Sequence, residues 1–202
     1  LLYYSDLGPS NQMRLIEAVY EEDALYPVRG KSCSSQAMPH LTLDFGTFHS
    51  FAIATLPELY NTRRLAQAER YEINTLESGV FVNDGKAGFS FLPLPRIAQS
   101  APGFGIVLTE VDGDGIPDLY MVQNFFGPQP ETGRMDGGVS LLLQGKGDCT
   151  FDPIWPNRSG LVVSGDAMGL AATDFDSDGW VDFSLTVNNG PMVAFRNRGS
   201  EN

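Results

Sequence analysis

The sequence predicts an all-β fold built from repeated units of about four short strands, with a short helical insertion. An acidic loop occurs twice, beginning at Glu110 and at Asp174, which are 64 positions apart (174 − 110). Strand-like sequence flanks both loops, and other motifs recur at offsets of 54 (195 − 141) to 60 (141 − 81). A period of this length holding four short strands is typical of β-propeller blades. We therefore expect about three four-stranded blades, a partial ring, over residues 1–202.

The first 30 residues read as a degenerate portion of a blade. A strand-like run, Leu1–Tyr4, precedes Asp6-Leu-Gly8-Pro-Ser10-Asn11. This segment begins like the acidic loops but lacks their remaining carboxylates. We expect no metal there.

Residues 47–70 interrupt the strand pattern and predict a helical insertion of two short helices. Thr55 offers an N-terminal cap, and Pro57 falls in the first turn of the helix that follows. Apolar side chains continue along the face of both helices: Phe48, Phe51, Ile53, Leu59, Leu65 and Ala66. The segment is either an insertion packed between two blades or a helix pair that binds a partner.

Residues 71–202 predict two well-formed blades and closing strands. Phe81–Lys86 recurs as Leu141–Lys146, and Phe195–Gly199 repeats the first part of this motif. A glycine that opens an apolar run precedes each acidic loop, at Gly105 and Gly169. Each unit therefore reads as glycine, strand, acidic loop, strand, connection, strand, turn and strand.

The segments that follow the two loops predict strands of different burial. Residues 119–122 are continuously apolar, as in a strand buried on both faces. After the second loop, apolar and polar residues alternate over residues 181–187, which is the pattern of a half-buried strand.

The acidic loops place carboxylates at positions 1, 3, 5 and 9 around a glycine at position 6. Ca²⁺ takes about six to eight oxygen ligands, and carboxylates packed this closely repel one another without a cation between them. We expect two Ca²⁺ sites, the second stronger because all four of its acids are aspartates. A metal-free Asp/Gly turn is the alternative. The predicted ligands, with backbone carbonyls at position 7, are Glu110, Asp112, Asp114, Ile116 and Asp118, then Asp174, Asp176, Asp178, Trp180 and Asp182.

An EF-hand is excluded, although it too begins with aspartates at alternate positions. It requires flanking helices and a bidentate glutamate at position 12. Here position 12 is Met121 in the first loop and Leu185 in the second.

Composition excludes several classes of partner. The chain has 202 residues, 42% of them hydrophobic, and a formal net charge of −12, which two Ca²⁺ ions would bring to about −8 (−12 + 4). An acidic surface argues against nucleic acid as a partner, because phosphate binding needs a basic one. No window is long and apolar enough to span a membrane.

Any signal peptide would lie upstream of Leu1 or have been removed. Cys33 and Cys149 are too few for a disulfide framework, although they could pair in an oxidising compartment.

The motifs resemble the FG-GAP or VCBS repeat, the blade of integrin-α-type propellers. Within that group, residues 81–89, 127–136 and 193–198 are similar to bacterial secreted relatives of the cartilage acidic protein and UnbV-like group. The resemblance implies a seven-bladed, calcium-stabilised propeller, secreted to an extracellular or periplasmic location, that serves in adhesion or assembly. About three blades cannot close such a ring, so we expect the remaining blades of a longer protein, or a protein partner, to complete it.

These observations favour a non-enzymatic module for protein binding, adhesion or scaffolding, in which residues 124–136 form a surface loop. The alternative is part of a propeller-based carbohydrate-active enzyme, a hydrolase or lyase, because a fold does not settle function. The sequence lacks a G-x-S-x-G elbow, an H-E-x-x-H zinc motif and a phosphate-binding loop. His40 and His49 stand outside the repeats. We therefore expect no catalytic residues.

Overall fold

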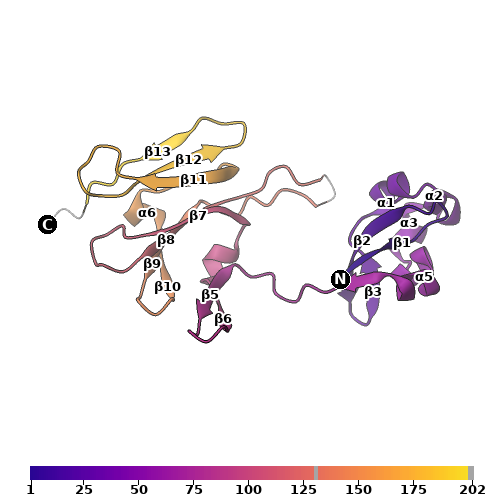
Figure 1. Cartoon of the computed structure of the whole chain (residues 1–202). Coiled ribbons are helices and arrows are strands. Elements are labelled where there is room, and N and C mark those ends of the chain that lie inside the picture. The colour runs from indigo at the N-terminus through magenta and orange to yellow at the C-terminus, as the bar shows by residue number, and fades with distance from the viewer. Residues whose placement is uncertain (130–131, 200–202) are drawn as a thin grey trace. The chain divides into compact units, whose positions relative to one another are not determined.

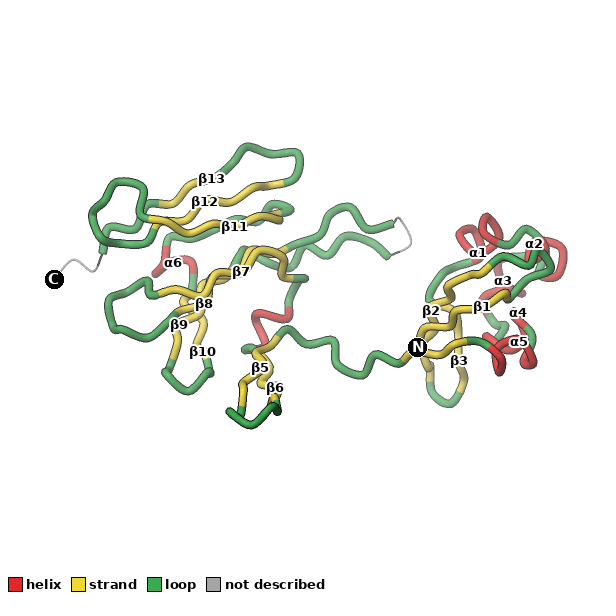
Figure 2. The backbone as a smooth tube through the Cα atoms, viewed as in Figure 1, coloured by secondary structure: helices red, strands yellow, loops and turns green. Residues whose placement is uncertain are grey.

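A computed structural model of the chain describes residues 1–129 and 132–199. The chain divides into two compact units, Leu1–Leu76 and Glu77–Asn202. The described residues are mostly β, with four small antiparallel sheets, none of them closed (Figures 1 and 2). The expected all-β class is confirmed at this level.

The first unit contains one four-stranded sheet with the strand order β3-β2-β1-β4. Its strands are β1 (Leu2–Asp6), β2 (Met13–Glu21), β3 (Ala24–Pro27) and β4 (Glu69–Tyr71). The segment that resembles a damaged acidic loop joins β1 to β2, which pair in an antiparallel register. It therefore connects two adjacent strands, as the intact loops do in the second unit.

Five short helices complete the first unit: α1 (Lys31–Ala37), α2 (His40–Asp44), α3 (Phe48–Ala52), α4 (Leu56–Tyr60) and α5 (Thr62–Gln67). Residues 47–70 thus hold three helices where the sequence predicted two. The extra boundary lies at Asn61, whose φ of 64° ends α4 and whose side chain accepts a hydrogen bond from the N–H of Arg63. The predicted cap at Thr55 is present: the N–H and the hydroxyl group of Thr55 both donate hydrogen bonds to the carboxylate of Glu58.

The second unit contains a four-stranded sheet, a three-stranded sheet and a hairpin. The four-stranded sheet has the order β10-β9-β8-β7, the three-stranded sheet β11-β12-β13, and the hairpin pairs β5 with β6. The strands are β5 (Gly79–Asn83), β6 (Phe89–Pro93), β7 (Gly103–Thr109), β8 (Asp118–Gln123), β9 (Leu141–Gly145), β10 (Phe151–Ile154), β11 (Ala167–Thr173), β12 (Asp182–Val187) and β13 (Val193–Phe195). A 3-10 helix, η1 (Arg96–Gln99), and α6 (Pro156–Ser159) lie in the connections.

Within the second unit, the four-stranded and three-stranded sheets pack against each other, with β11 contacting β7 and β8 (Figure 1). The core between them includes Tyr120 and Phe183, whose ring centroids are 4.8 Å apart. The close approach requires glycine at position 105, since a Cβ there would lie 2.8 Å from both Cβ and backbone N of Leu170. Gly105, the third residue of β7, thus lets the sheets pack closely.

The other face of the four-stranded sheet is only partly covered. On that face, Leu119 and Met121 of β8 form a core with β9, and Leu94 and Ala98 pack against it. Ile106 and Leu108 of β7 lie opposite Met121 and Leu119 in the register, so they share this face, yet they are 55% and 60% exposed. A stripe of apolar surface is therefore left open on β7.

The predicted burial of two strands is confirmed. Every residue of β8 is buried, as the continuous apolar run predicted. Along β12, Phe183 and Leu185 are buried while Thr186 is exposed.

Within the described residues no helix is long and apolar enough to cross a lipid bilayer. Cys33 and Cys149 are both free thiols.

Candidate metal centre

The two acidic loops occupy equivalent places in the two packed sheets. Residues 110–117 connect β7 to β8, and residues 174–181 connect β11 to β12. Both strand pairs are antiparallel, and each loop begins directly after its first strand. The repeat found in the sequence is thus also a repeat in three dimensions.

Three carboxylates converge in each loop. Glu110, Asp112 and Asp118 each offer one oxygen within 4.8 Å of the others, and Asp174, Asp176 and Asp182 do the same. These are positions 1, 3 and 9 of the predicted sites. The acids at position 5, Asp114 and Asp178, are not part of these clusters. The position 7 carbonyls of Ile116 and Trp180 stay a prediction.

The position 1 carboxylates organise the turns through backbone hydrogen bonds. Glu110 Oε1 accepts from the N–H groups of Asp112 (2.9 Å) and Gly113 (2.6 Å), and Oε2 accepts from Gly115. The hydrogen bond from Gly113 is the main reason that the pKa of Glu110 lies below its ordinary value.

Asp174 has the same role in the second loop. Its two oxygens accept from the N–H groups of Gly179 (2.9 Å) and Asp178 (3.2 Å). The hydrogen bond from Gly179 lowers the pKa of Asp174 most. Both position 1 acids are therefore held in the ionised form, which is the form that binds a cation.

The position 9 carboxylates are fully buried and tie each loop to the neighbouring strands. Asp118 accepts from the N–H groups of Val111 (3.1 Å) and Gly145 (2.9 Å). Burial raises the pKa of Asp118, and the charge of Asp112 adds to this effect. A carboxylate this deeply buried needs either a proton or a nearby positive charge.

Asp182 accepts equivalent hydrogen bonds from the N–H groups of Phe175 and Asn197, both at 2.8 Å. Asn197 is therefore the structural equivalent of Gly145. The repeat predicted from the sequence pairs Gly199 with Gly145, and this pairing is wrong by two residues. The glycines resemble each other in sequence, but the hydrogen bonds to the position 9 acids fix the register.

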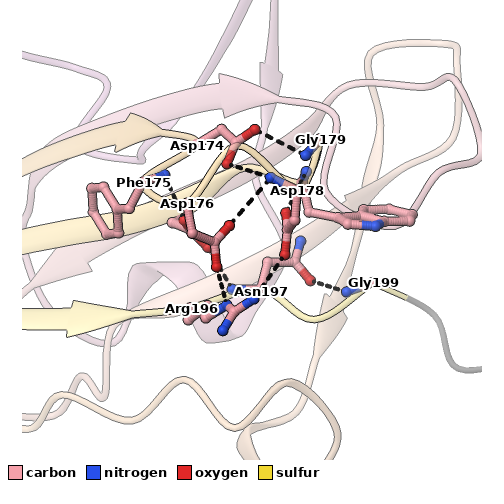
Figure 3. A network of polar contacts seen from close by, with 10 residues as sticks. Asp174, Phe175, Asp176, Asp178, Gly179, Arg196, Asn197 and Gly199 are labelled. Carbon is pink, nitrogen blue, oxygen red and sulfur yellow. Dashed lines mark hydrogen bonds and ion pairs between the residues drawn. The ribbon is translucent and has the colours of Figure 1, made fainter.

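This register makes Gln144 and Arg196 equivalent, and both contact the position 3 acid of their own loop. Gln144 Nε2 donates to Asp112 Oδ2 at 2.8 Å. Arg196 forms ion pairs with Asp176 and, at 3.3 Å, with Asp178 Oδ2 (Figure 3). The spacing of the acidic residues does not reveal either side chain, because Gln144 lies in β9 and Arg196 directly after β13, outside the loops.

The two loops are connected to each other. Asn197 Nδ2 donates to the carbonyl oxygen of Val111, at 2.9 Å. The half-buried Trp180 of the second loop also packs so closely on Gly113 of the first that a Cβ there would lie 2.9 Å from Cη2. A cavity of about 550 Å³ adjoins the first loop, and its lining includes Asp112, Asp118, Arg158, Arg196 and Arg198.

The donor set fits a hard divalent cation. Both clusters consist of carboxylate oxygens, and within the described part of the chain no ion pair reaches the acids of the first loop. Two acidic clusters able to bind a metal ion are therefore present. Comparisons with protein-family models, curated proteins and solved structures gave no match to the chain.

Proposed function

We propose that the second unit consists of calcium-stabilised β-propeller blades of the FG-GAP or VCBS type, and that the chain serves as an extracellular or periplasmic module for protein binding, adhesion or scaffolding. One observation carries the proposal: two hairpins at equivalent places in packed sheets bear the same three-carboxylate cluster. Repetition of a cluster together with its strand context supports a common ligand.

Calcium is the cation that this donor set favours. Clustered carboxylates repel one another, and a buried one such as Asp118 is costly unless its charge is compensated. Ca²⁺ accepts an irregular set of oxygen ligands, whereas Mg²⁺ demands near-octahedral geometry and retains water. Extracellular calcium sites typically have dissociation constants of about 10⁻⁴ to 10⁻³ M, so such sites are filled outside the cell and empty in cytosol. The proposed location would therefore supply enough Ca²⁺ to fill such sites.

The need for further blades or a protein partner is supported by the incomplete hairpin β5–β6. It has two strands where the adjacent sheet has four, and Phe81 and Phe89 are 67% and 64% exposed. Additional strands alongside β5 would cover the open stripe formed by Ile106 and Leu108 of β7. We propose that the remaining blades, or another subunit, supply them.

The proposed role is structural rather than catalytic. The carboxylates at positions 1 and 9 accept hydrogen bonds from backbone N–H groups within or beside their own loops. These hydrogen bonds fix the carboxylates in place, and at Glu110 and Asp174 they also lower the pKa and so favour the ionised form, which suits cation binding better than proton transfer in glycoside cleavage. The carbohydrate-active enzyme is the less favoured alternative.

Calcium-dependent stability tests the proposal. We expect Ca²⁺ at about 100 times the dissociation constant to stabilise the folded chain by about 2.7 kcal/mol per filled site, measured by thermal or urea unfolding against EDTA. The double variant Asp112→Asn with Asp176→Asn should lose this gain. The matched control, Asp23→Asn with Asp136→Asn, removes the same charge at exposed positions outside the loops and should keep it. Equal stability of the unmodified chain in Ca²⁺ and in EDTA would refute the proposal.

A further inference from the structure

The two acidic loops differ in the charge of the side chain that contacts their position 3 acid. In the first loop this side chain is the neutral amide of Gln144, which donates to Asp112. In the second it is the guanidinium group of Arg196, which pairs with Asp176. The equivalent position thus supplies a positive charge to one loop only.

Arg196 also engages the position 5 acid of the second loop. Its Nη2 lies 3.3 Å from Asp178 Oδ2, while Asp178 Oδ1 accepts from the N–H of Trp180. Both oxygens of Asp178 therefore have a protein partner. In the first loop, Asp114 Oδ1 accepts from the N–H of Ile116, and Oδ2 has no hydrogen-bond donor among the described residues.

We propose that Arg196 is a built-in counter-ion that competes with calcium for the second loop, so that calcium must displace its guanidinium group from Asp176 and Asp178. The second loop then binds calcium more weakly than the first, the reverse of the order expected from its four aspartates. This inference rests on the proposed calcium-binding function. Its physical basis is that two cations cannot share the same pair of carboxylates without repulsion.

The structure leaves room for the displacement. The Arg196 side chain is 60% exposed, and it lines the cavity of about 550 Å³ that adjoins the first loop. A side chain with several rotatable bonds can leave the two carboxylates without moving the backbone. Exposed ion pairs of this kind are weak enough for a divalent ion to break.

An arginine has a related place in the first unit. Arg64 Nη1 lies 3.6 Å from Asp6 Oδ1 at the degenerate loop between β1 and β2, and it also donates to the carbonyl oxygen of Gly8. This loop has lost the other carboxylates of a metal site. The guanidinium group of Arg64 beside Asp6 supports the idea that an arginine can take the place of a metal ion at such a turn.

Calcium titration of single-loop variants of the full chain tests the proposal. Asp112→Asn with Asp114→Asn removes two predicted ligands from the first loop, so that isothermal titration calorimetry measures calcium binding at the second loop alone. In that background we expect Arg196→Gln to tighten calcium binding by about three- to tenfold, the range expected from losing exposed ion pairs. The reciprocal change, Gln144→Arg with the second loop silenced by Asp176→Asn and Asp178→Asn, should weaken calcium binding at the first loop by a similar factor.

Three further measurements separate competition from other effects. Arg198→Gln removes the same charge two residues away, where the arginine has no ion pair among the described residues, and should change the affinity by less than about twofold. In EDTA, Arg196→Gln should lower the melting temperature, while the gain on adding calcium should grow. Arg196→Lys keeps the charge and should stay close to the unmodified loop.

The outcomes separate this inference from the function beneath it. If calcium binds but Arg196→Gln leaves the affinity of the second loop unchanged or lower, Arg196 acts as an outer support and the inference is overturned. If neither loop binds calcium in any variant, the calcium-binding function itself fails.

Discussion

Asn197 links the two acidic loops by donating from Nδ2 to the carbonyl oxygen of Val111, across 86 positions of the chain. The backbone N–H of Asn197 donates to the buried Asp182, and its Oδ1 accepts from the N–H of Gly199. One residue thus fixes the second loop through its main chain and the first loop through its side chain. The geometry of the two loops is coupled at this point.

Replacing Asn197 with alanine should uncouple the loops. The change removes two side-chain hydrogen bonds and keeps the main-chain bond to Asp182, so we expect a loss of about 1–3 kcal/mol in the free energy of unfolding, measured by urea denaturation. Asn157→Ala is the matched control, because Asn157 is exposed and has no hydrogen bond from its side chain among the described residues. A loss no larger than that of the control would show that the link contributes nothing to stability.

Replacing Gly105 with alanine should separate the packed sheets. The added methyl group would lie 2.8 Å from the backbone N of Leu170, and backbone cannot move aside as a flexible side chain can. Overpacking of this kind costs about 1–3 kcal/mol, which chemical denaturation would detect. Gly127→Ala should cost much less, because no atom of the described residues lies within 4 Å of the added Cβ. Similar losses in the two variants would argue against close packing at Gly105.

Tyr120→Phe should leave stability unchanged or raise it by up to about 1 kcal/mol at neutral pH. The hydroxyl of Tyr120 is buried and lacks a hydrogen-bond partner among the described residues, so its removal relieves an unpaired polar group. Thermal unfolding of both proteins measures the effect, with the exposed Tyr20→Phe as control. A loss above about 1 kcal/mol would indicate a hydrogen bond that these contacts do not include.

The same substitution should reduce sensitivity to alkali. Burial raises the pKa of Tyr120 above its ordinary value of 10.0, so the folded chain keeps a proton that the unfolded chain loses. This contribution is fully present below pH 10.0 and is lost as the pH rises further towards the folded-state pKa. The stability of Tyr120→Phe should therefore fall less steeply above that pH. Identical slopes would contradict this assignment.

The open stripe on β7 should promote association. We expect Ile106→Ser with Leu108→Ser to reduce self-association or partner capture in size-exclusion chromatography with light scattering, while the melting temperature changes little. Val107→Ser changes the intervening residue, which packs towards the core between the sheets, and should instead lower the melting temperature. A chain that is already monomeric without these changes would count against an interface here.

The sequence predicted those features whose signal is local. The continuous apolar run at 119–122 and the alternation at 181–187 identified β8 and β12, because burial on two faces or on one leaves a direct trace in residue order. The acidic spacing identified the loops, and the structure brings positions 1, 3 and 9 of each together.

The features missed by sequence analysis depend on contacts between distant segments. Arg196 follows directly after β13 and meets Asp176 of a loop earlier in the chain. The two-residue shift that makes Arg196 equivalent to Gln144 is fixed by hydrogen bonds rather than by residue type. The extra helix boundary at Asn61 depends on a positive φ. Asparagine tolerates this conformation, but its presence in a sequence does not predict it. The division near Leu76 reflects which contacts form, which composition alone does not reveal.

Trp180 belongs to one loop and packs on Gly113 of the other, and this makes its indole a shared optical probe. Occupancy of either loop would alter the surroundings of the same ring, so its fluorescence would follow total filling rather than a single binding event. The contact also allows order gained in one loop to be passed to its neighbour. A Hill coefficient above one for calcium would then arise within a single polypeptide, without any change in oligomeric state.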